Sequence, residues 1–293
     1  MPNAIALDIG GTKIEGVLFN EKYKELKKER ILFNRNAPQK EILRIIFNII
    51  SNLKTNKLNG IGISIPDHVS PSGKLSGMCK IKSIRNLSLR SILQKKYKCK
   101  VIVQNDADCF AVAEHFLGAA KGADTSIGVI IGTGIGSGII LKDQLYLSKR
   151  GSAAEFGHNV INPSGPKCRC GLNGDIESFA AGPNLVRNYK AKGGKLKNPD
   201  PKIIFLSKEK AAKDSVKEAL EALAIGISSL INIFDPDIIV LGGGLSNLSL
   251  TEKLIALTKK YTMIDFRNNF KIVKNKLGDS AGVYGAAYLI FNK

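Results

Sequence analysis

The feature that most constrains the fold is an arrangement of strands that occurs twice in the chain. Each copy reads strand, glycine turn, strand, polar turn, strand, and the copies begin near residues 4 and 127. The sequence therefore predicts an internal structural duplication. The six strands are expected at residues 4–7, 14–19, 31–33, 127–131, 136–141 and 145–147.

The stretches between and after these copies alternate between helical and strand patterns. Apolar residues at helical spacing predict four helices, at 41–53, 107–117, 214–234 and 281–290. Short apolar runs predict buried strands at 60–65, 101–103 and 238–241. The chain is therefore expected to have an α/β fold.

Composition excludes several classes of protein. With 44% hydrophobic and 24% charged residues, the 293-residue chain is typical of globular proteins. No apolar run is long enough for a spanning helix, and the first residues lack the basic region of a signal peptide. Five cysteines without a leader favour reduced thiols and a cytoplasmic location.

The formal charge of +19 leaves two interpretations open. Lys and Arg are scattered along the chain, which favours a solvated basic surface that also attracts nucleotide phosphates. The alternative is a nucleic-acid partner, which a salt-dependent duplex-binding measurement would detect. We expect neither nucleic acid nor membrane as a partner.

Three glycine-containing turns follow predicted strands. Glycine lets backbone N–H groups approach a ligand closely, and successive N–H groups can hold phosphate. The first turn, Asp-Ile-Gly-Gly-Thr-Lys, also offers a carboxylate for Mg²⁺, and two such corners could clamp a triphosphate; the alternative is a set of plain tight turns. The candidate residues are Asp8, Gly10, Gly11, Thr12, Lys13, Gly132, Thr133, Gly134, Gly136, Gly242 and Gly243.

Two further groups of residues suggest chemistry. Asn105-Asp106 precedes a predicted helix, so Asp106 fits either a helix N-cap or a general base. His158 precedes Cys168 and Cys170 by ten and twelve residues, and these side chains suit Zn²⁺. The alternative there is an exposed loop with free thiols.

Together these motifs resemble those of the ROK sugar kinases, in the actin/hexokinase-like superfamily, over nearly the whole chain. The matching segments are residues 8–13, 105–107, 131–138, 155–158, 168–177, 240–247 and 278–283. The resemblance is greatest to the bacterial fructokinase, N-acetylglucosamine kinase and glucokinase branch. It implies a two-lobed, ribonuclease H-like ATPase fold with a duplicated βββαβαβα core and a cleft between the lobes. The implied lobes are residues 1–114 with 281–293, and residues 115–280 with a Cys/His loop at 155–177.

The resemblance also implies an activity and roles for individual residues. The implied reaction is transfer of the ATP γ-phosphate to the 6-hydroxyl of a sugar such as fructose or glucose, with an N-acetylhexosamine as the alternative acceptor. Asp106 would be the base, and the glycine turns would hold ATP with Mg²⁺. The residues implied to hold the sugar are Asn105, Asp106, Glu155, His158 and Glu177.

The family also contains sugar-responsive transcription regulators, which place a helix-turn-helix domain before the kinase-like region. Here the first phosphate motif already begins at residue 8, so this function is disfavoured. Members of the family are often oligomers, and we expect a homodimer or a higher homo-oligomer.

Three departures from the family pattern stand out. Asp175 replaces the usual third cysteine of the zinc loop, so the predicted metal ligands are His158, Cys168, Cys170 and Asp175. Asp67 replaces the glycine of a usual Pro-Gly pair. Residues 76–80 replace a stretch that usually offers asparagine, so the identity of the sugar stays open.

Overall fold

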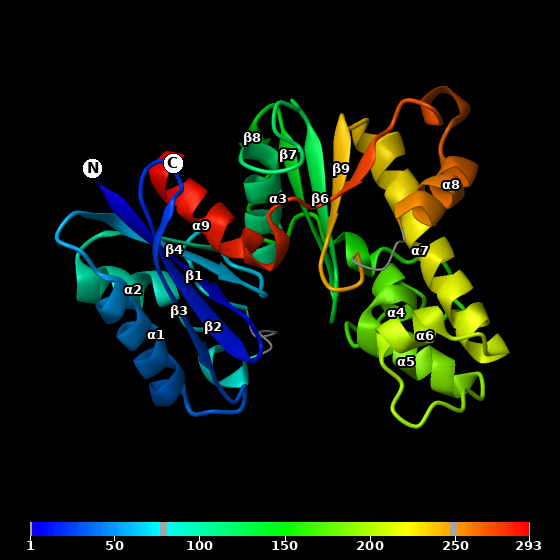
Figure 1. Ribbon diagram of the computed structural model, residues 1–293, viewed down its shortest axis with the longest axis horizontal. Coiled ribbons are helices and arrows are strands. Elements are labelled where there is room, and N and C mark those ends of the chain that lie inside the picture. Colours follow the sequence, from blue (N-terminus) through cyan, green and yellow to red (C-terminus); the bar gives the residue numbers. More distant parts are fainter. Residues whose placement is uncertain (1, 77–80, 247–250, 293) are drawn as a thin grey trace. The chain divides into compact units, whose positions relative to one another are not determined.

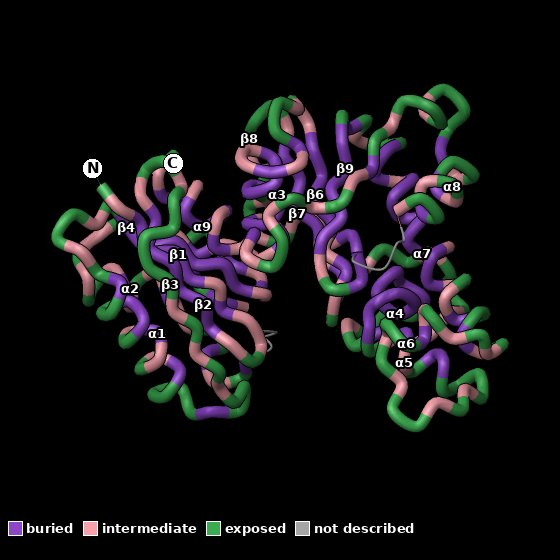
Figure 2. Tube along the Cα trace, viewed as in Figure 1, coloured by how far each residue is buried: buried purple, intermediate pink, exposed green. Residues whose placement is uncertain are grey.

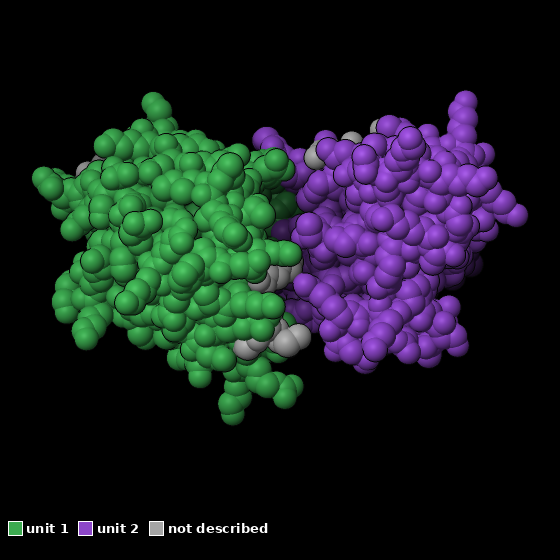
Figure 3. All heavy atoms as spheres, turned by 90° about the horizontal axis from the view of Figure 1, so that it is seen from below, with its two compact units in different colours: residues 1–118, 144–153, 277–293 green, residues 119–143, 154–276 purple. Residues whose placement is uncertain are grey.

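The computed structural model describes residues 2–76, 81–246 and 251–292. Its contacts divide the chain into two compact units, coloured separately in Figure 3. Unit 1 comprises residues 1–118, 144–153 and 277–293, and unit 2 comprises residues 119–143 and 154–276. The sequence-based division places its boundaries after residues 114 and 280 and does not separate 144–153. In the described parts of the chain, no helix is long and apolar enough to cross a lipid bilayer.

The first sheet has the strand order β3-β2-β1-β4-β5 (Figure 1). β1 (Asn3–Ile9), β2 (Lys13–Phe19) and β3 (Glu25–Leu32) form an antiparallel meander. On its other side β1 pairs in parallel with β4 (Leu58–Ile65), which pairs in parallel with β5 (Lys100–Asn105). Because β1, β4 and β5 are parallel, their carboxyl ends lie at the same end of the sheet.

The second sheet repeats this order with later segments of the chain. Its order is β10-β9-β6-β7-β8, so β6 takes the place of β1, and β9 and β10 take the places of β4 and β5. β6 pairs antiparallel with β7 and in parallel with β9, as β1 does with β2 and β4. The shared order confirms the predicted duplication. The strands are β6 (Ser126–Ile131), β7 (Ile135–Leu141), β8 (Gln144–Leu145), β9 (Ile238–Gly242) and β10 (Ile272–Lys274).

Helices cover both faces of the first sheet. α1 (Gln39–Leu53) packs on one face, where a Cβ added to Gly16 would come within 2.3 Å of Ile49. α9 (Ala281–Asn292) packs on the other face, where a Cβ on Gly62 would come within 2.2 Å of the carbonyl oxygen of Ala286. Between these layers β1, β2 and β4 are mostly buried, as Figure 2 shows, whereas β3 at the edge of the sheet is largely exposed.

The four predicted helices are confirmed as α1, α3 (Asp106–Phe116), α7 (Lys210–Phe234) and α9, with ends that differ by a few residues. Other helices in the structure were not predicted. Four of them bury few residues, so their apolar period is weak, and the fifth is fully buried but only five residues long, which is too short to display a helical period. They are α2 (Leu89–Tyr97), α4 (Ile176–Ala180), α5 (Gly182–Ala191), α6 (Pro201–Leu206) and α8 (Thr251–Tyr261).

The predicted bounds of the third strand were wrong in both copies. The strand expected at 31–33 is the end of β3, whose first half is polar because β3 is an exposed edge strand. The strand expected at 145–147 is reduced to the two residues of β8.

Candidate active site

Three residues predicted for the site lie at the carboxyl ends of the parallel strands in unit 1. Asp8 lies near the end of β1, Asn105 ends β5, and Asp106 begins α3. Burial and, to a smaller extent, the charge of Asp106 raise the pKa of Asp8 to about 6, although the hydrogen bond from Ser64 and the charge of Lys13 act in the opposite direction. The structure thus brings two carboxyl groups and a lysine together at this end of the sheet.

The turn between β1 and β2 carries the first glycine motif. The Gly10 N–H donates to the Lys13 carbonyl oxygen at 2.9 Å, which closes the turn. A Cβ added to Gly11 would meet no atom within 4 Å, so the outer side of the turn is open in unit 1. The turn therefore leaves backbone groups of Gly11 open to a ligand, and phosphate binding by residues 10–13 stays a prediction.

Asp8 also belongs to a polar row across the sheet that sequence reasoning missed. Residues directly opposite one another on neighbouring strands share a face, and this register aligns Arg30, Glu15, Asp8, Ser64 and Gln104. The Ser64 hydroxyl donates to Asp8 Oδ1 at 2.7 Å, and the Arg30 Nε donates to Glu15 Oε2 at 2.7 Å. The signal in the sequence is a single polar residue within an apolar strand, at Glu15 and at Ser64.

Asn105, and not Asp106, is the N-cap of α3. The Asn105 Oδ1 accepts from the N–H groups of Ala107 at 2.8 Å and Asp108 at 3.3 Å. The N-cap interpretation of Asp106 was therefore wrong, because Asp106 is the first residue of the helix; its Oδ1 accepts from the N–H of its neighbour Ala107 at 2.9 Å. This position leaves Asp106 in the first turn, where the helix dipole favours a negative charge.

Asp67, one of the departures from the family pattern, is buried beside Asn105. The Asn105 Nδ2 donates to the carbonyl oxygen of Asp67 at 3.2 Å. Burial raises the pKa of Asp67, although hydrogen bonds from Ser76 and His68 act in the opposite direction. Residues 77–80, the remainder of the stretch expected to face the sugar, lie outside the described residues.

In unit 2 the second and third glycine turns lie next to each other. Gly243 has a φ of +88°, and a Cβ on it would come within 2.4 Å of the Ile131 carbonyl oxygen at the end of β6. The Gly182 N–H, at the start of α5, donates to the Gly132 carbonyl oxygen at 2.8 Å. The structure therefore gathers Gly132, Gly243 and the N-terminus of α5 into one glycine-rich surface. Asn247, at the end of the third motif, lies outside the described residues.

Glu177 connects the second glycine turn to the residues predicted to hold the sugar. It is 3% exposed, and its Oε2 accepts from the Ile135 N–H at 2.8 Å. Gly157, between Glu155 and His158, packs so closely that a Cβ on it would come within 2.3 Å of the Ile135 carbonyl oxygen. The sequence did not predict that Glu177 would also hold the second glycine turn.

The predicted metal ligands form a cluster in unit 2. The ligand atoms of His158, Cys168, Cys170 and Asp175 all lie within 4.8 Å of one another. His158 Nδ1 lies 2.9 Å from Asp175 Oδ2, and Cys170 Sγ lies 3.3 Å from the same oxygen. The ligands of a tetrahedral zinc site are separated by roughly 3.5 Å, so the four residues fit Zn²⁺.

Asp175 is suited to replace a thiolate in this cluster. Burial alone would raise its pKa, but hydrogen bonds from Cys168, His158 and Ser178 lower it overall. Its second oxygen, Oδ1, caps α4 by accepting from the Ser178 N–H at 2.7 Å. The cap fixes the carboxylate, so Oδ2 is held toward the other three ligands.

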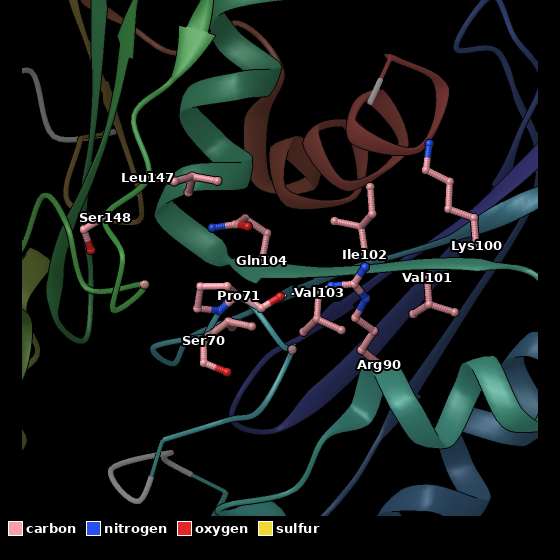
Figure 4. A pocket seen from close by; sticks show the side chains of 13 residues that line it. Ser70, Pro71, Arg90, Lys100, Val101, Ile102, Val103, Gln104, Leu147 and Ser148 are labelled. Carbon is pink, nitrogen blue, oxygen red and sulfur yellow. Dashed lines mark hydrogen bonds between the residues drawn. The ribbon is translucent and has the colours of Figure 1, made fainter.

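A pocket of about 380 Å³ lies along β5 in unit 1. Figure 4 shows that it is lined by Val103 and Gln104 of β5, by Ser70 and Pro71 of the preceding loop, and by Arg90 of α2. None of its lining residues was predicted for the site, and the sequence carries no motif that indicates it.

Comparisons with known proteins agree with the geometry. The model of the ROK family matches residues 4–293. The chain is 29% identical to a glucokinase from Thermotoga maritima (98% of this chain, 96% of that protein) and 31% identical to an N-acetyl-D-glucosamine kinase from Haemophilus influenzae (98% and 99%). A ROK family glucokinase from Streptomyces griseus, solved with glucose and AMPPNP, superposes with a TM-score of 0.82 at 27% identity and covers 98% of each chain.

Proposed function

The chain belongs to the ROK family, and on this premise we propose that it is an ATP-dependent hexose kinase. The proposed reaction transfers the γ-phosphate of ATP to the 6-hydroxyl of a sugar such as glucose or fructose. The observation that carries the proposal is the pair Asp8 and Asp106 beside the open glycine turn of unit 1. These groups supply a base, a metal-binding carboxylate and backbone donors, which are what phosphoryl transfer requires.

Asp106 is the proposed general base. Its carboxylate takes the proton from the sugar hydroxyl while the oxygen of that hydroxyl bonds to the γ-phosphorus, and the bond to the β-phosphate oxygen breaks to release ADP. Asp8 is proposed to hold Mg²⁺ through water, and the bound cation would neutralise charge on the phosphates. Lys13, which acts on the pKa of Asp8, adds a second positive charge nearby.

The glycine turns are the proposed phosphate and nucleotide contacts. Gly10, Gly11, Thr12 and Lys13 would act from unit 1, and Gly132, Thr133, Gly134 and Gly136 from unit 2. Gly242 and Gly243 would contact adenosine. A Cβ added to the adjoining Gly244 would meet no atom within 4 Å, so this turn is open to a ligand on that side in unit 2.

Asn105, Asp106, Glu155, His158 and Glu177 are the proposed sugar contacts. Two of them are held firmly in unit 2. His158 Nδ1 is turned toward the metal cluster, so its Nε2 is left for a sugar hydroxyl. Glu177 Oε2 is bonded to the Ile135 N–H, so Oε1, which lies 3.4 Å from Arg169 Nε, is the oxygen that would face the sugar.

Zn²⁺ is the proposed structural cofactor. His158, Cys168, Cys170 and Asp175 would hold it, and when bound it would fix the orientation of the His158 ring. Burial raises the pKa of Cys168 to about 12, so this thiol must lose its proton when the metal binds.

The test is a coupled assay of ADP release with fructose, glucose, mannose, N-acetylglucosamine and N-acetylmannosamine. Turnover with an unmodified hexose supports the proposal, with the position of the phosphate established by NMR of the product. ATP hydrolysis that no sugar stimulates would contradict it.

An N-acetylhexosamine kinase is the second candidate. The observation in its favour is the 31% identity to a relative named N-acetyl-D-glucosamine kinase. The same panel separates the two, because the candidate requires kcat/KM for an N-acetylated sugar to exceed that for glucose.

A further inference from the structure

Asp67 is a buried carboxyl group that the proposed mechanism does not use. It follows Pro66 directly after β4, at the same end of the sheet as Asn105 and Asp106. Only 5% of Asp67 is exposed. A carboxyl group this far from solvent needs hydrogen-bond partners in the protein, and those partners indicate its role.

Both carboxyl oxygens of Asp67 bind the loop that follows it. Oδ1 accepts from the His68 N–H at 2.9 Å and from the Ser76 hydroxyl, and Oδ2 accepts from the Ser76 N–H at 3.0 Å. The residues between them form a small hairpin, closed by an antiparallel bridge between Val69 and Leu75. Asp67 is therefore hydrogen-bonded to both arms of this hairpin, at the point where the chain leaves β4.

The backbone of Asp67 holds the residue that precedes the proposed base. Its carbonyl oxygen accepts from Asn105 Nδ2 at 3.2 Å, while the other end of the same amide caps α3. A displacement of Asp67 would therefore move the Asn105 side chain and the first turn of the helix that carries Asp106.

Packing fixes this hairpin only in part. Val69 and Ser70 line the pocket along β5, and Figure 4 shows Ser70 beside it. The backbone at Val69 packs closely against Gly151, where an added Cβ would come within 2.0 Å of the Val69 carbonyl oxygen. Arg90 holds the tip through a bond from Nη1 to the Pro71 carbonyl oxygen at 3.0 Å. At the base of the hairpin, the bonds to Asp67 add to one backbone bond, from the Ser76 N–H to the His68 carbonyl oxygen at 3.1 Å.

We propose that Asp67 is a positioning residue for the sugar: it sets the hairpin 69–75 and the Asn105 amide in a fixed relation to each other. The inference rests on the proposed kinase function. Asp67 does not touch the reacting atoms, and its effect passes through Asn105 and through Ser76. Losing Asp67 should therefore weaken sugar binding more than ATP binding.

The test compares Asp67→Ala and Asp67→Asn with the wild-type chain. For Asp67→Ala we expect the KM of the sugar to rise at least tenfold, while the KM of ATP stays within threefold. Asp67→Asn keeps one acceptor oxygen, so its KM for the sugar should lie between those of the wild type and of Asp67→Ala. Hydrogen exchange of residues 68–76, measured without substrates, should be at least tenfold faster in Asp67→Ala.

The matched control is Asp237→Ala. Asp237 Oδ2 accepts from the N–H groups of Asp124 and Thr125, both at 2.9 Å, just before the amino end of β6 and therefore at the opposite end of that strand from the glycine turn. This variant loses a similar number of loop bonds and should keep the KM of the sugar within twofold.

Three results would overturn the inference: a KM of the sugar within twofold of wild type in Asp67→Ala, equal rises in both KM values, or unchanged hydrogen exchange. Failure of the proposed function itself is distinguishable, because it would appear as a wild-type chain that no sugar activates. The exchange measurement tests the fastening of the hairpin even in that case.

Discussion

Asp8 is the residue at which folding and the proposed chemistry make opposite demands. Its folded pKa of about 6 lies above the ordinary aspartate value of 3.8, so between these pH values the native chain binds more protons than the unfolded chain. The stability of the native state therefore falls as pH rises through this window. The ionised form that would hold Mg²⁺ is the form that destabilises the fold.

Asp8→Asn should accordingly stabilise the protein at pH 8 while abolishing kinase activity. The amide removes the buried charge and can still accept from Ser64, so we expect the free energy of unfolding to rise by about 2 kcal/mol or less. Urea titration without Mg²⁺ measures the difference, which should shrink toward pH 4. A variant that is less stable than wild type at pH 8 would contradict this assignment.

Asp106→Asn should lower kcat at least 100-fold and leave the KM of ATP within about threefold, because the variant keeps its shape but cannot accept the proton. Steady-state kinetics with the accepted sugar measures both. The control is Asp108→Asn on the same helix, where the amide oxygen can still accept the bond that Gln104 Nε2 makes at 2.7 Å. Near-normal turnover in Asp106→Asn would falsify the assignment of the base.

Local sequence predicted these two carboxylates but not their partners. Asp8 and Asp106 stand in short motifs next to strand ends. Ser64 is 56 positions away from Asp8, so only the register of β1 against β4 brings them together. Asn and Asp are almost equally good N-caps, so the sequence could not decide between Asn105 and Asp106.

At the scale of elements, the close packing of α9 depends on glycine. A Cβ on Gly285 would come within 1.8 Å of the Cys109 carbonyl oxygen in α3. Gly285→Ala should therefore force the two helices apart and lower the free energy of unfolding by about 1–3 kcal/mol. Thermal or urea unfolding measures this loss. Gly244→Ala is the control, since an added Cβ there meets no atom within 4 Å; equal stabilities of the two variants would refute the packing argument.

The metal loop is the second element whose role can be tested. Removal of Zn²⁺ by a chelator, or Cys170→Ser, should raise the KM of the sugar by displacing His158. Metal content is measured by atomic absorption, and kinetics follow on the same sample. Cys99→Ser serves as the control, because Cys99 lies outside the cluster. An unchanged KM after complete loss of metal would show that the loop is not needed for sugar binding.

Helices with a strong apolar period could be predicted from the sequence, whereas short helices that bury few residues could not. α1 and α7 bury a continuous stripe of residues, which the spacing in the sequence displays. α2 buries only Leu89 and Leu93, and its start depends on the Ser88 side chain, which accepts from the Ser91 N–H. A single cap of this kind is too common in sequences to predict a helix.

For the whole molecule, the repeated turn pattern was sufficient to predict the duplicated topology. Both sheets use the same order of connections, although few residue identities are shared between the two copies. The identity of the sugar could not be predicted, because the repeated framework carries no information about the few side chains that would contact it.

The charge of +19 is also a property of the whole chain. A positive surface attracts ATP and has no such effect on a neutral sugar, so kcat/KM for ATP should fall several-fold between about 20 and 300 mM salt. The value for the sugar should change by less than twofold. Equal sensitivity of both values would indicate a general effect of salt on the fold.

α9 comes later in the chain than every strand of both sheets, yet it covers a face of the first sheet. During translation, β1 through β5 leave the ribosome long before the helix that completes their packing, whereas every strand of the second sheet is already made. The half of the protein that is synthesised first is therefore the half that must wait to finish folding. A premature stop shortly before residue 281 would release a chain with β1 and β4 uncovered, which is a natural target for chaperones and proteases.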